Sequence, residues 1–179
     1  MLRKILIAVA VLIVVFVIVV AMQPAEFRVS RSATFAATPA AVFAQVNDLH
    51  KWDAWSPWAK LDPNAKNSFE GPAAGVGAAM TWSGNNEVGE GRMTITESRP
   101  DELVRFRLDF MKPMSGTSTA EFTFKPDGGT TVVTWTMSGT NGFIGKAVGL
   151  FMNCDKMLGD YFEKGLASMK AIAEAKPGT

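Results

Sequence analysis

The amino-acid sequence predicts an α+β domain in which an antiparallel sheet packs against one long C-terminal helix, behind a single N-terminal transmembrane helix. Three observations support this fold class. Residues 5–22 form an unbroken apolar run, residues 79–137 repeatedly alternate apolar and polar side chains, and the apolar spacing over residues 145–175 becomes helical. Alternation with a period of two indicates strands with one buried face, whereas helical spacing indicates an amphipathic helix.

The N-terminal segment is expected to be a membrane anchor. Ile5–Met22 contains no charge, Pro or Gly, and it directly follows Arg3 and Lys4. As a helix it would be roughly 27 Å long, close to the hydrocarbon thickness of a bilayer. The alternative is a cleaved signal peptide, whose apolar region usually spans about 7–15 residues. The sequence Val19-Val20-Ala21 offers a small-residue cleavage pattern, and both interpretations direct the chain to a membrane.

Charge around this segment predicts the orientation. Positive residues before the segment favour a cytoplasmic N-terminus and an exported remainder, although Arg28 and Arg31 follow closely on the other side. We therefore expect a single-pass protein of a bacterial inner membrane with a periplasmic C-terminal domain, or a secreted protein if the segment is cleaved. The expected divisions are a flank at 1–4, the anchor at 5–22, a linker at 23–26, one domain at 27–175 and a tail at 176–179.

The domain is predicted to begin with a strand and two helices. Residues 27–35 alternate between apolar and polar side chains, as a half-buried strand does. Thr38 then suits a helix N-cap and Pro39 the first helical position. A second, short helical piece is expected over Lys51–Trp58. The buried stripe of the first helix is predicted to comprise Val42, Phe43, Val46 and Leu49.

An antiparallel meander is predicted to follow. Apolar and polar residues alternate in five segments, and the turn sequences Ser83–Asn86 and Pro126–Gly129 separate neighbouring pairs. Regular alternation argues for one apolar face and one solvated face. The five expected strands cover residues 79–82, 88–97, 104–110, 120–124 and 132–137.

The C-terminal helix, over residues 145–175, is expected to lie on the apolar face of this sheet, because a long apolar stripe needs a large apolar partner. Gly149, Gly159 and Gly165 lie within the segment, where each costs about 1 kcal/mol relative to Ala. Side chains missing at these glycines would leave space between helix and sheet. The predicted stripe comprises Ala147, Phe151, Cys154, Leu158, Tyr161, Phe162, Met169 and Ile172.

Composition excludes several classes of function. The chain has 18 Lys and Arg residues against 17 Asp and Glu, and no basic stripe, so nucleic acid is a poor candidate partner. The single cysteine, Cys154, rules out an internal disulfide. His50 is the one histidine, which restricts the acid–base and metal chemistry available. No cofactor is expected.

Several segments resemble the START-like (SRPBCC) superfamily, and more closely its polyketide cyclase/dehydrase and lipid-transport type with an N-terminal membrane anchor. The resemblance covers essentially all of residues 27–175. Its fold is the helix-grip fold, which implies a curved sheet around the C-terminal helix with an apolar cavity between them. The segments that carry it are Thr38–Phe43, Trp52–Trp58, Gly71-Pro72, Gly75–Gly77, Trp82–Asn85, Val88–Gly91, Thr119–Phe124, Thr131–Trp135, Gly149–Met152 and Phe162–Leu166.

The resemblance implies that the cavity binds apolar or amphipathic small molecules such as lipids, sterols or polyketides. Trp52, Trp55 and Trp58 are spaced at helical intervals, and they form either an aromatic rim at the cavity mouth or a plug that closes one end of the sheet. The candidate ligand-contacting residues are Trp52, Trp55, Trp82, Met93, Glu97, Phe106, Phe122, Trp135, Phe151, Leu158 and Tyr161.

Polar candidates are few. Glu97 shares parity with Met93 and Ile95, so it is expected to face inward near a strand end. Tyr161 could offer a hydroxyl to a ligand from the C-terminal helix. His50, with Asp48 and Asp53 nearby, falls short of the ligand set of a usual zinc site, so no metal is expected. Cys154 is expected to line the core or the cavity as a small hydrophobic residue.

Two functions compete. The first is a membrane-tethered domain that binds or carries a hydrophobic, lipid-like small molecule, for which the scarcity of catalytic residue types is an argument. The alternative is a cyclase/dehydrase-like enzyme that acts on an apolar substrate in the same cavity, using Glu97, Tyr161 or His50 as acid or base. The expected partners are the membrane, through the N-terminal helix, and the hydrophobic ligand.

Overall fold

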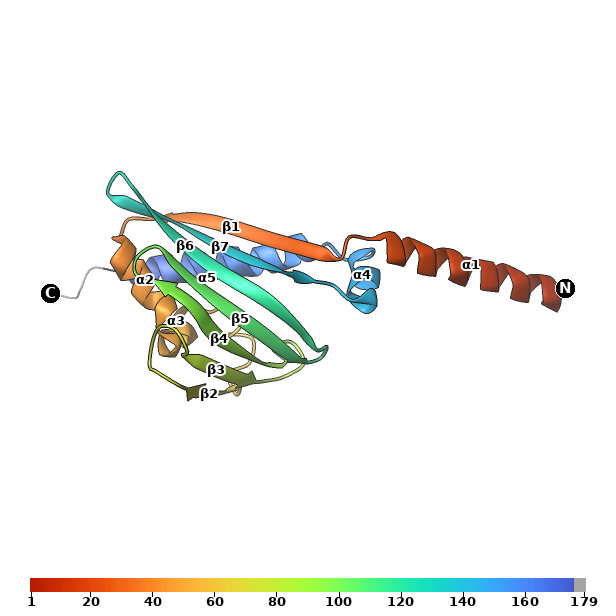
Figure 1. Ribbon diagram of the computed structural model, residues 1–179, viewed down its shortest axis with the longest axis horizontal. Helices are drawn as coiled ribbons and strands as arrows, with labels where there is room; N and C mark the ends of the chain where they lie inside the picture. The colour runs from red at the N-terminus through yellow and green to blue at the C-terminus, as the bar shows by residue number, and fades with distance from the viewer. Residues whose placement is uncertain (176–179) are drawn as a thin grey trace.

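The computed structural model describes residues 1–175 (Figure 1). The expected tail at 176–179 lies outside the described residues. The elements are α1 (Leu2–Met22), β1 (Glu26–Phe35), α2 (Pro39–Asn47), a short 3-10 turn (Leu49–Lys51), α3 (Trp52–Trp55), β2 (Lys66–Glu70), β3 (Ala79–Ser83), β4 (Glu90–Arg99), β5 (Leu103–Lys112), β6 (Gly116–Asp127), β7 (Thr130–Thr140), α4 (Phe143–Gly149) and α5 (Cys154–Glu174).

The predicted antiparallel sheet and its helical partner are confirmed. The seven strands form one sheet in the order β1-β7-β6-β5-β4-β3-β2, so the first strand pairs with the last. Figure 1 shows α5 lying along the sheet beside β1, β6 and β7, while α1 projects from one end. This is the helix-grip arrangement. β2 was not expected, because every one of its residues is exposed and its sequence therefore lacks the alternation of a half-buried strand.

The two short helices after β1 close one end of the sheet. The hydroxyl of Thr38 accepts a hydrogen bond from the Ala41 N–H at the start of α2, as predicted for an N-cap. The expected helix over Lys51–Trp58 is shorter than predicted and covers only Trp52–Trp55, after the 3-10 turn. Ser56 is extended, with φ −58° and ψ 129°, because a residue before proline is driven out of the helical region.

The C-terminal helix is two helices instead of the single helix that was predicted. α4 ends at Gly149, and α5 begins after Asn153, whose side-chain oxygen accepts a hydrogen bond from the Lys156 N–H at 2.9 Å. This N-cap fixes a new helix start. The buried side of α5 carries Phe162, Leu166 and Met169, which have helical spacing.

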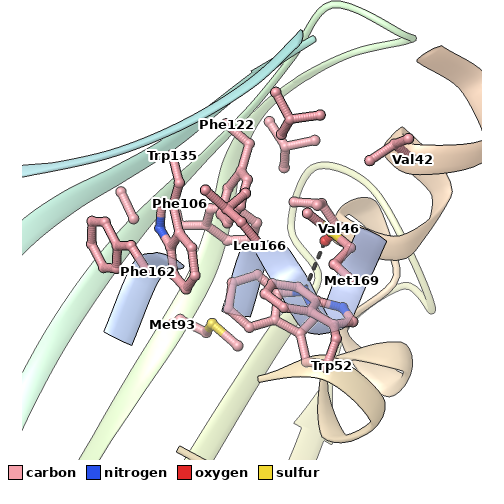
Figure 2. Close-up of a cluster of buried hydrophobic side chains, with 14 of the residues drawn as sticks. Val42, Val46, Trp52, Met93, Phe106, Phe122, Trp135, Phe162, Leu166 and Met169 are labelled. Atoms are coloured by element: carbon pink, nitrogen blue, oxygen red, sulfur yellow. Dashed lines mark hydrogen bonds between the residues drawn. The ribbon is translucent and has the colours of Figure 1, made fainter. Parts of the chain in front are cut away.

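α5 approaches the sheet closely where it has no side chain. A Cβ built at Gly165 would lie 2.8 Å from Cζ3 of Trp135 and 3.0 Å from Cδ of Pro57. The Trp135 ring stacks on Phe162 with ring centroids 4.2 Å apart, and on Phe122 with centroids 4.7 Å apart. Figure 2 shows Trp135 beside these two rings in the buried cluster.

A second glycine lets an ionic contact join α5 to β1. Arg31 of β1 pairs with Asp155 at 3.1 Å and with Glu163 at 3.0 Å, both on α5. A Cβ at Gly159 would lie 2.0 Å from Nη2 of Arg31, so the guanidinium occupies the space that the missing side chain leaves.

Gly165→Ala is expected to lower the free energy of unfolding by about 1–3 kcal/mol, because overpacking against Trp135 and Pro57 outweighs the gain of about 1 kcal/mol in helix propensity. Gly149→Ala is the matched control, since a Cβ at this position would have no neighbouring atom within 4 Å, and it should be neutral or slightly stabilising. Urea unfolding followed by tryptophan fluorescence would measure both. Equal effects of the two substitutions would contradict the close approach.

Candidate functional site

An apolar pocket of about 230 Å³ lies between the sheet and α5. Its walls come from α3 and the loop after it, from β2 to β7, and from the first half of α5. The polar lining residues are Asp53, Ser56 and Asn67. The apolar lining residues are Trp52, Trp58, Ala59, Ala65, Met80, Trp82, Val88, Met93, Phe106, Leu108, Phe110, Ala120, Trp135, Met137, Leu158 and Phe162.

Strand register explains why the pocket lies here. Ala120 of β6 stands opposite Phe106 of β5 on one side and Met137 of β7 on the other. A methyl group between two long side chains leaves room that a larger residue would fill. At the other wall, Trp82 lies over Gly91, where a Cβ would be 2.4 Å from Cζ2 of the indole ring. The pocket therefore lies over Ala120, the small residue between two large ones, and is bounded by the Trp82 ring.

Most polar atoms near the pocket already have partners. The indole N–H of Trp52 donates to the Val46 carbonyl at 2.9 Å, the hydrogen bond drawn in Figure 2. The indole N–H of Trp55 donates to the Gln45 carbonyl at 3.1 Å. At the rim, the Asn67 amide donates to the exposed carboxylate of Asp53 at 2.9 Å. The site is thus an apolar chamber with polar groups mainly at its edge.

Trp135 is the exception. Its side chain is 2% exposed, and its Nε1 has no hydrogen-bond partner. Within residues 1–175, Nε1 of Trp135 is the only buried side-chain nitrogen or oxygen without a hydrogen-bond partner. Buried polar groups are almost always hydrogen-bonded, so this one needs an explanation.

The structure brings together six of the predicted site residues. Trp55 and Phe122 are instead fully buried in the aromatic cluster behind the pocket. Tyr161 is half-buried and stacks on Trp58, outside the lining. Contact of any of these residues with a ligand stays a prediction. The six that line the pocket are Trp52, Trp82, Met93, Phe106, Trp135 and Leu158.

The expectation that Glu97 faces inward is wrong. The register of β4 shifts between Ile95 and Glu97, so Thr96 is an extra residue and the parity inverts beyond it. Glu97 lies on the outer face, where its carboxylate accepts a hydrogen bond from Arg105, which also pairs with Glu121 at 2.7 Å. Hydrogen bonding to Glu121 is the main cause that raises the pKa of Arg105.

The prediction that Phe151 and Cys154 lie on the buried stripe of the C-terminal helix is also wrong. Both are exposed, with Phe151 79% exposed, because the break before α5 takes them out of the buried stripe. The C-terminal stripe thus begins later than predicted.

His50 lies on the surface, away from the pocket lining. Its Nδ1 lies 3.1 Å from Oδ1 of Asp48, and its ring stacks on Phe69 with centroids 4.0 Å apart. Among the residues that the structure describes, no three His, Cys, Asp or Glu side chains gather in a way that could hold a metal ion.

Sequence reasoning missed part of the lining, although the signal was present. Leu108 and Phe110 share the parity of Phe106 on β5, and Met137 shares that of Trp135 on β7. Trp58 lines the pocket, in agreement with the aromatic rim that its spacing suggested. The remaining missed residues required knowledge of register, loop course and helix placement; they are Asp53, Ser56, Ala59, Ala65, Asn67, Met80, Val88, Ala120 and Phe162.

Comparisons with known proteins agree with this architecture. A family model described as polyketide cyclase / dehydrase and lipid transport matches residues 26–174. Protein CV1439 from Chromobacterium violaceum has 16% sequence identity and a TM-score of 0.60, over 86% of this chain and 100% of that chain. The Aha1 dimer from Colwellia psychrerythraea also has 16% identity and a TM-score of 0.60, over 85% and 99%.

A di-domain ARO/CYC structure is similar as well. The di-domain ARO/CYC StfQ from the steffimycin biosynthetic pathway has 11% identity and a TM-score of 0.60, over 84% of this chain and 51% of that chain. At these identities the likeness establishes the fold alone. No curated relative matches the chain by sequence.

Ala120→Phe should fill the pocket, because the larger ring occupies the space that a probe would need. The affinity for a fluorescent apolar probe should fall by about tenfold or more, which corresponds to a loss of about 1.4 kcal/mol in binding free energy. Thr119→Phe is the matched control, because Thr119 is the exposed neighbour on the opposite face of β6. Titration of both full-length variants with the probe would measure the difference. Unchanged binding by Ala120→Phe would place the probe elsewhere.

Proposed function

Because this chain belongs to the polyketide cyclase/dehydrase and lipid transport family, we propose that it is a membrane-tethered domain that binds or carries a hydrophobic, lipid-like small molecule. The observation that carries the proposal is the apolar pocket between the sheet and α5. An apolar ligand entering it would gain about 0.8 kcal/mol for each methylene group removed from water. Such binding requires little polar chemistry, and the lining offers little.

The tether is part of the proposal. α1, Leu2–Met22, is long and apolar enough to cross a membrane, although an N-terminal signal sequence can also be long and apolar. We favour an anchor, because the apolar run at 5–22 is longer than the about 7–15 residues usual for a signal peptide. Arg3 and Lys4 before α1 support a cytoplasmic N-terminus and, in a bacterium, a periplasmic domain. A secreted domain is the alternative outcome.

A second candidate function is a cyclase/dehydrase-like enzyme acting in the same pocket. The similarity of the fold to an ARO/CYC protein favours it. Glu97, Tyr161 and His50, the acid–base candidates from sequence, lie outside the pocket lining, whereas Asp53 is within it. An enzyme would therefore use Asp53 at the rim, and Asp53→Asn would abolish turnover without abolishing ligand binding.

Native mass spectrometry of the full-length protein released from detergent micelles should reveal a bound apolar ligand in stoichiometric amount. Lipids that adhere to α1 could mimic this result, so the Ala120→Phe variant is the control. A ligand held in the pocket should disappear from this variant, whereas lipids on α1 should remain. If wild type and variant carry the same molecules, the binding proposal fails.

A further inference from the structure

The unpartnered indole N–H of Trp135 has a restricted environment. Phe122 and Phe162 stack on the ring, and its Cζ3 edge faces Gly165 of α5. Nε1 lies at the opposite end of the indole from Cζ3, so the N–H is directed away from that contact with α5. Trp135 also lines the pocket, but Nε1 itself is covered in this structure. A molecule in the pocket can therefore supply a hydrogen-bond acceptor to Nε1 once neighbouring side chains of the lining move aside.

We propose that the ligand of this pocket carries a neutral hydrogen-bond acceptor, such as a ketone, ester, ether or hydroxyl oxygen, that accepts from Nε1 of Trp135. This inference rests on the proposed binding function and specifies its ligand class. A buried donor without a partner is unfavourable, so a ligand that supplies an acceptor gains affinity and a fixed orientation.

Charge in the lining argues against an anionic acceptor. Among the described residues that line the pocket none is Lys or Arg, and the one ionisable group is the carboxyl of Asp53. A carboxylate or phosphate placed at Trp135 would lose its hydration without meeting a positive partner. The headgroup that meets Trp135 is therefore uncharged, and any ionised group of the ligand lies at the open rim.

A matched pair of probes tests this. Acetylnaphthalene and isopropenylnaphthalene have the same number of non-hydrogen atoms and nearly the same shape, and only the ketone has an oxygen acceptor. The ketone should bind the full-length protein about 3–10-fold more tightly, as expected for one neutral hydrogen bond. Nitrogen–proton NMR spectra should show the Trp135 indole signal shifting with the ketone. The Trp52 and Trp55 indoles are internal references, because both N–H groups already have carbonyl partners.

The outcomes are separable. Equal binding of both probes with no shift of the Trp135 signal would overturn this inference while leaving the binding function intact. Binding of neither probe would overturn the binding function for ligands of this size. Trp135→Phe should retain isopropenylnaphthalene binding and lose the preference for the ketone. The wild-type NMR result stands even if that variant folds poorly.

A different observation concerns the surface beside α1. Phe143, Ile144, Phe151, Met152 and Met157 are each 48–79% exposed, and we call them the α4 patch. Figure 1 shows α4 at the end of the domain from which α1 departs. Exposed apolar side chains gathered in one place mark an interaction surface.

The α4 patch contacts α1 at residues that precede the C-terminal end of α1. Phe151 stacks on Phe16 with ring centroids 6.5 Å apart, and Nζ of Lys146 donates to the Ala21 carbonyl at 3.3 Å. Phe16 precedes Met22, the last residue of α1, by six positions. At 1.5 Å per residue this is about 9 Å along the helix axis. If α1 spans a bilayer, Phe151 lies at the depth of the acyl chains.

We infer that the α4 patch is embedded in the same bilayer as α1, as a second membrane contact of the domain. This inference rests on the proposed tether. Contact with α1 at acyl-chain depth selects lipid as the occupant, and Lys146, at the level of Ala21, is placed where anionic headgroups lie.

Spin labelling tests this membrane contact. Cys154 is the one cysteine of the chain, and it is exposed between Met152 and Met157 of the α4 patch. A nitroxide there, in full-length protein reconstituted into phosphatidylethanolamine–phosphatidylglycerol vesicles, should relax more with oxygen than with a water-soluble nickel chelate. The control is Lys125→Cys combined with Cys154→Ser, since Lys125 is exposed in the β6–β7 hairpin far from α1. The label at position 125 of this control should relax more with the nickel chelate than with oxygen.

A nickel-accessible label at Cys154 in intact, membrane-bound protein would overturn the second contact and leave the tether standing. A chain recovered in the soluble fraction and shortened at its N-terminus would overturn the tether itself. Spin–spin coupling between Cys154 labels of two chains would assign the α4 patch to a self-interface instead.

Discussion

The close approach of α5 to the sheet at Gly165 is the constraint on which the rest of the structure depends. There the helix rests against the ring of Trp135, which is itself stacked between Phe122 and Phe162. One end of the helix–sheet interface is therefore closed by tightly packed rings. The pocket lies beside the earlier part of α5, at Leu158 and Phe162, where the opposing strands carry Ala120 between larger residues.

The two faces of the sheet have separate chemistries. Ion pairs such as Arg105 with Glu97 and Glu121 lie on the outer face, where water screens them and they contribute little to stability. The inner face is mainly apolar, and within residues 1–175 the buried side-chain polar atom without a partner is Nε1 of Trp135. This division suits recognition by desolvation and shape, with a single polar group to fix the orientation of a bound molecule.

Much of this architecture could be predicted from sequence, because period-two and helical spacing directly reflect burial. The prediction went wrong where a local event changed the phase of a pattern. The extra residue Thr96 turned Glu97 outward, and the Asn153 cap placed Phe151 outside the buried stripe. The pocket itself depends on register, because Ala120 is a cavity-forming residue only when Phe106 and Met137 stand opposite it. No single strand carries that information.

The junction between α1 and β1 has a mechanical consequence. Only Gln23, Pro24 and Ala25 separate the two elements, and the Asn141 N–H donates to the Ala25 carbonyl at 2.7 Å. β1 is in turn paired along its whole length with β7. If α1 anchors the domain in a bilayer, tilting of α1 is transmitted to the sheet through this short junction, and a pull along α1 loads the β1–β7 ladder in shear. The domain would then stay at the lipid surface and turn about the axis of α1.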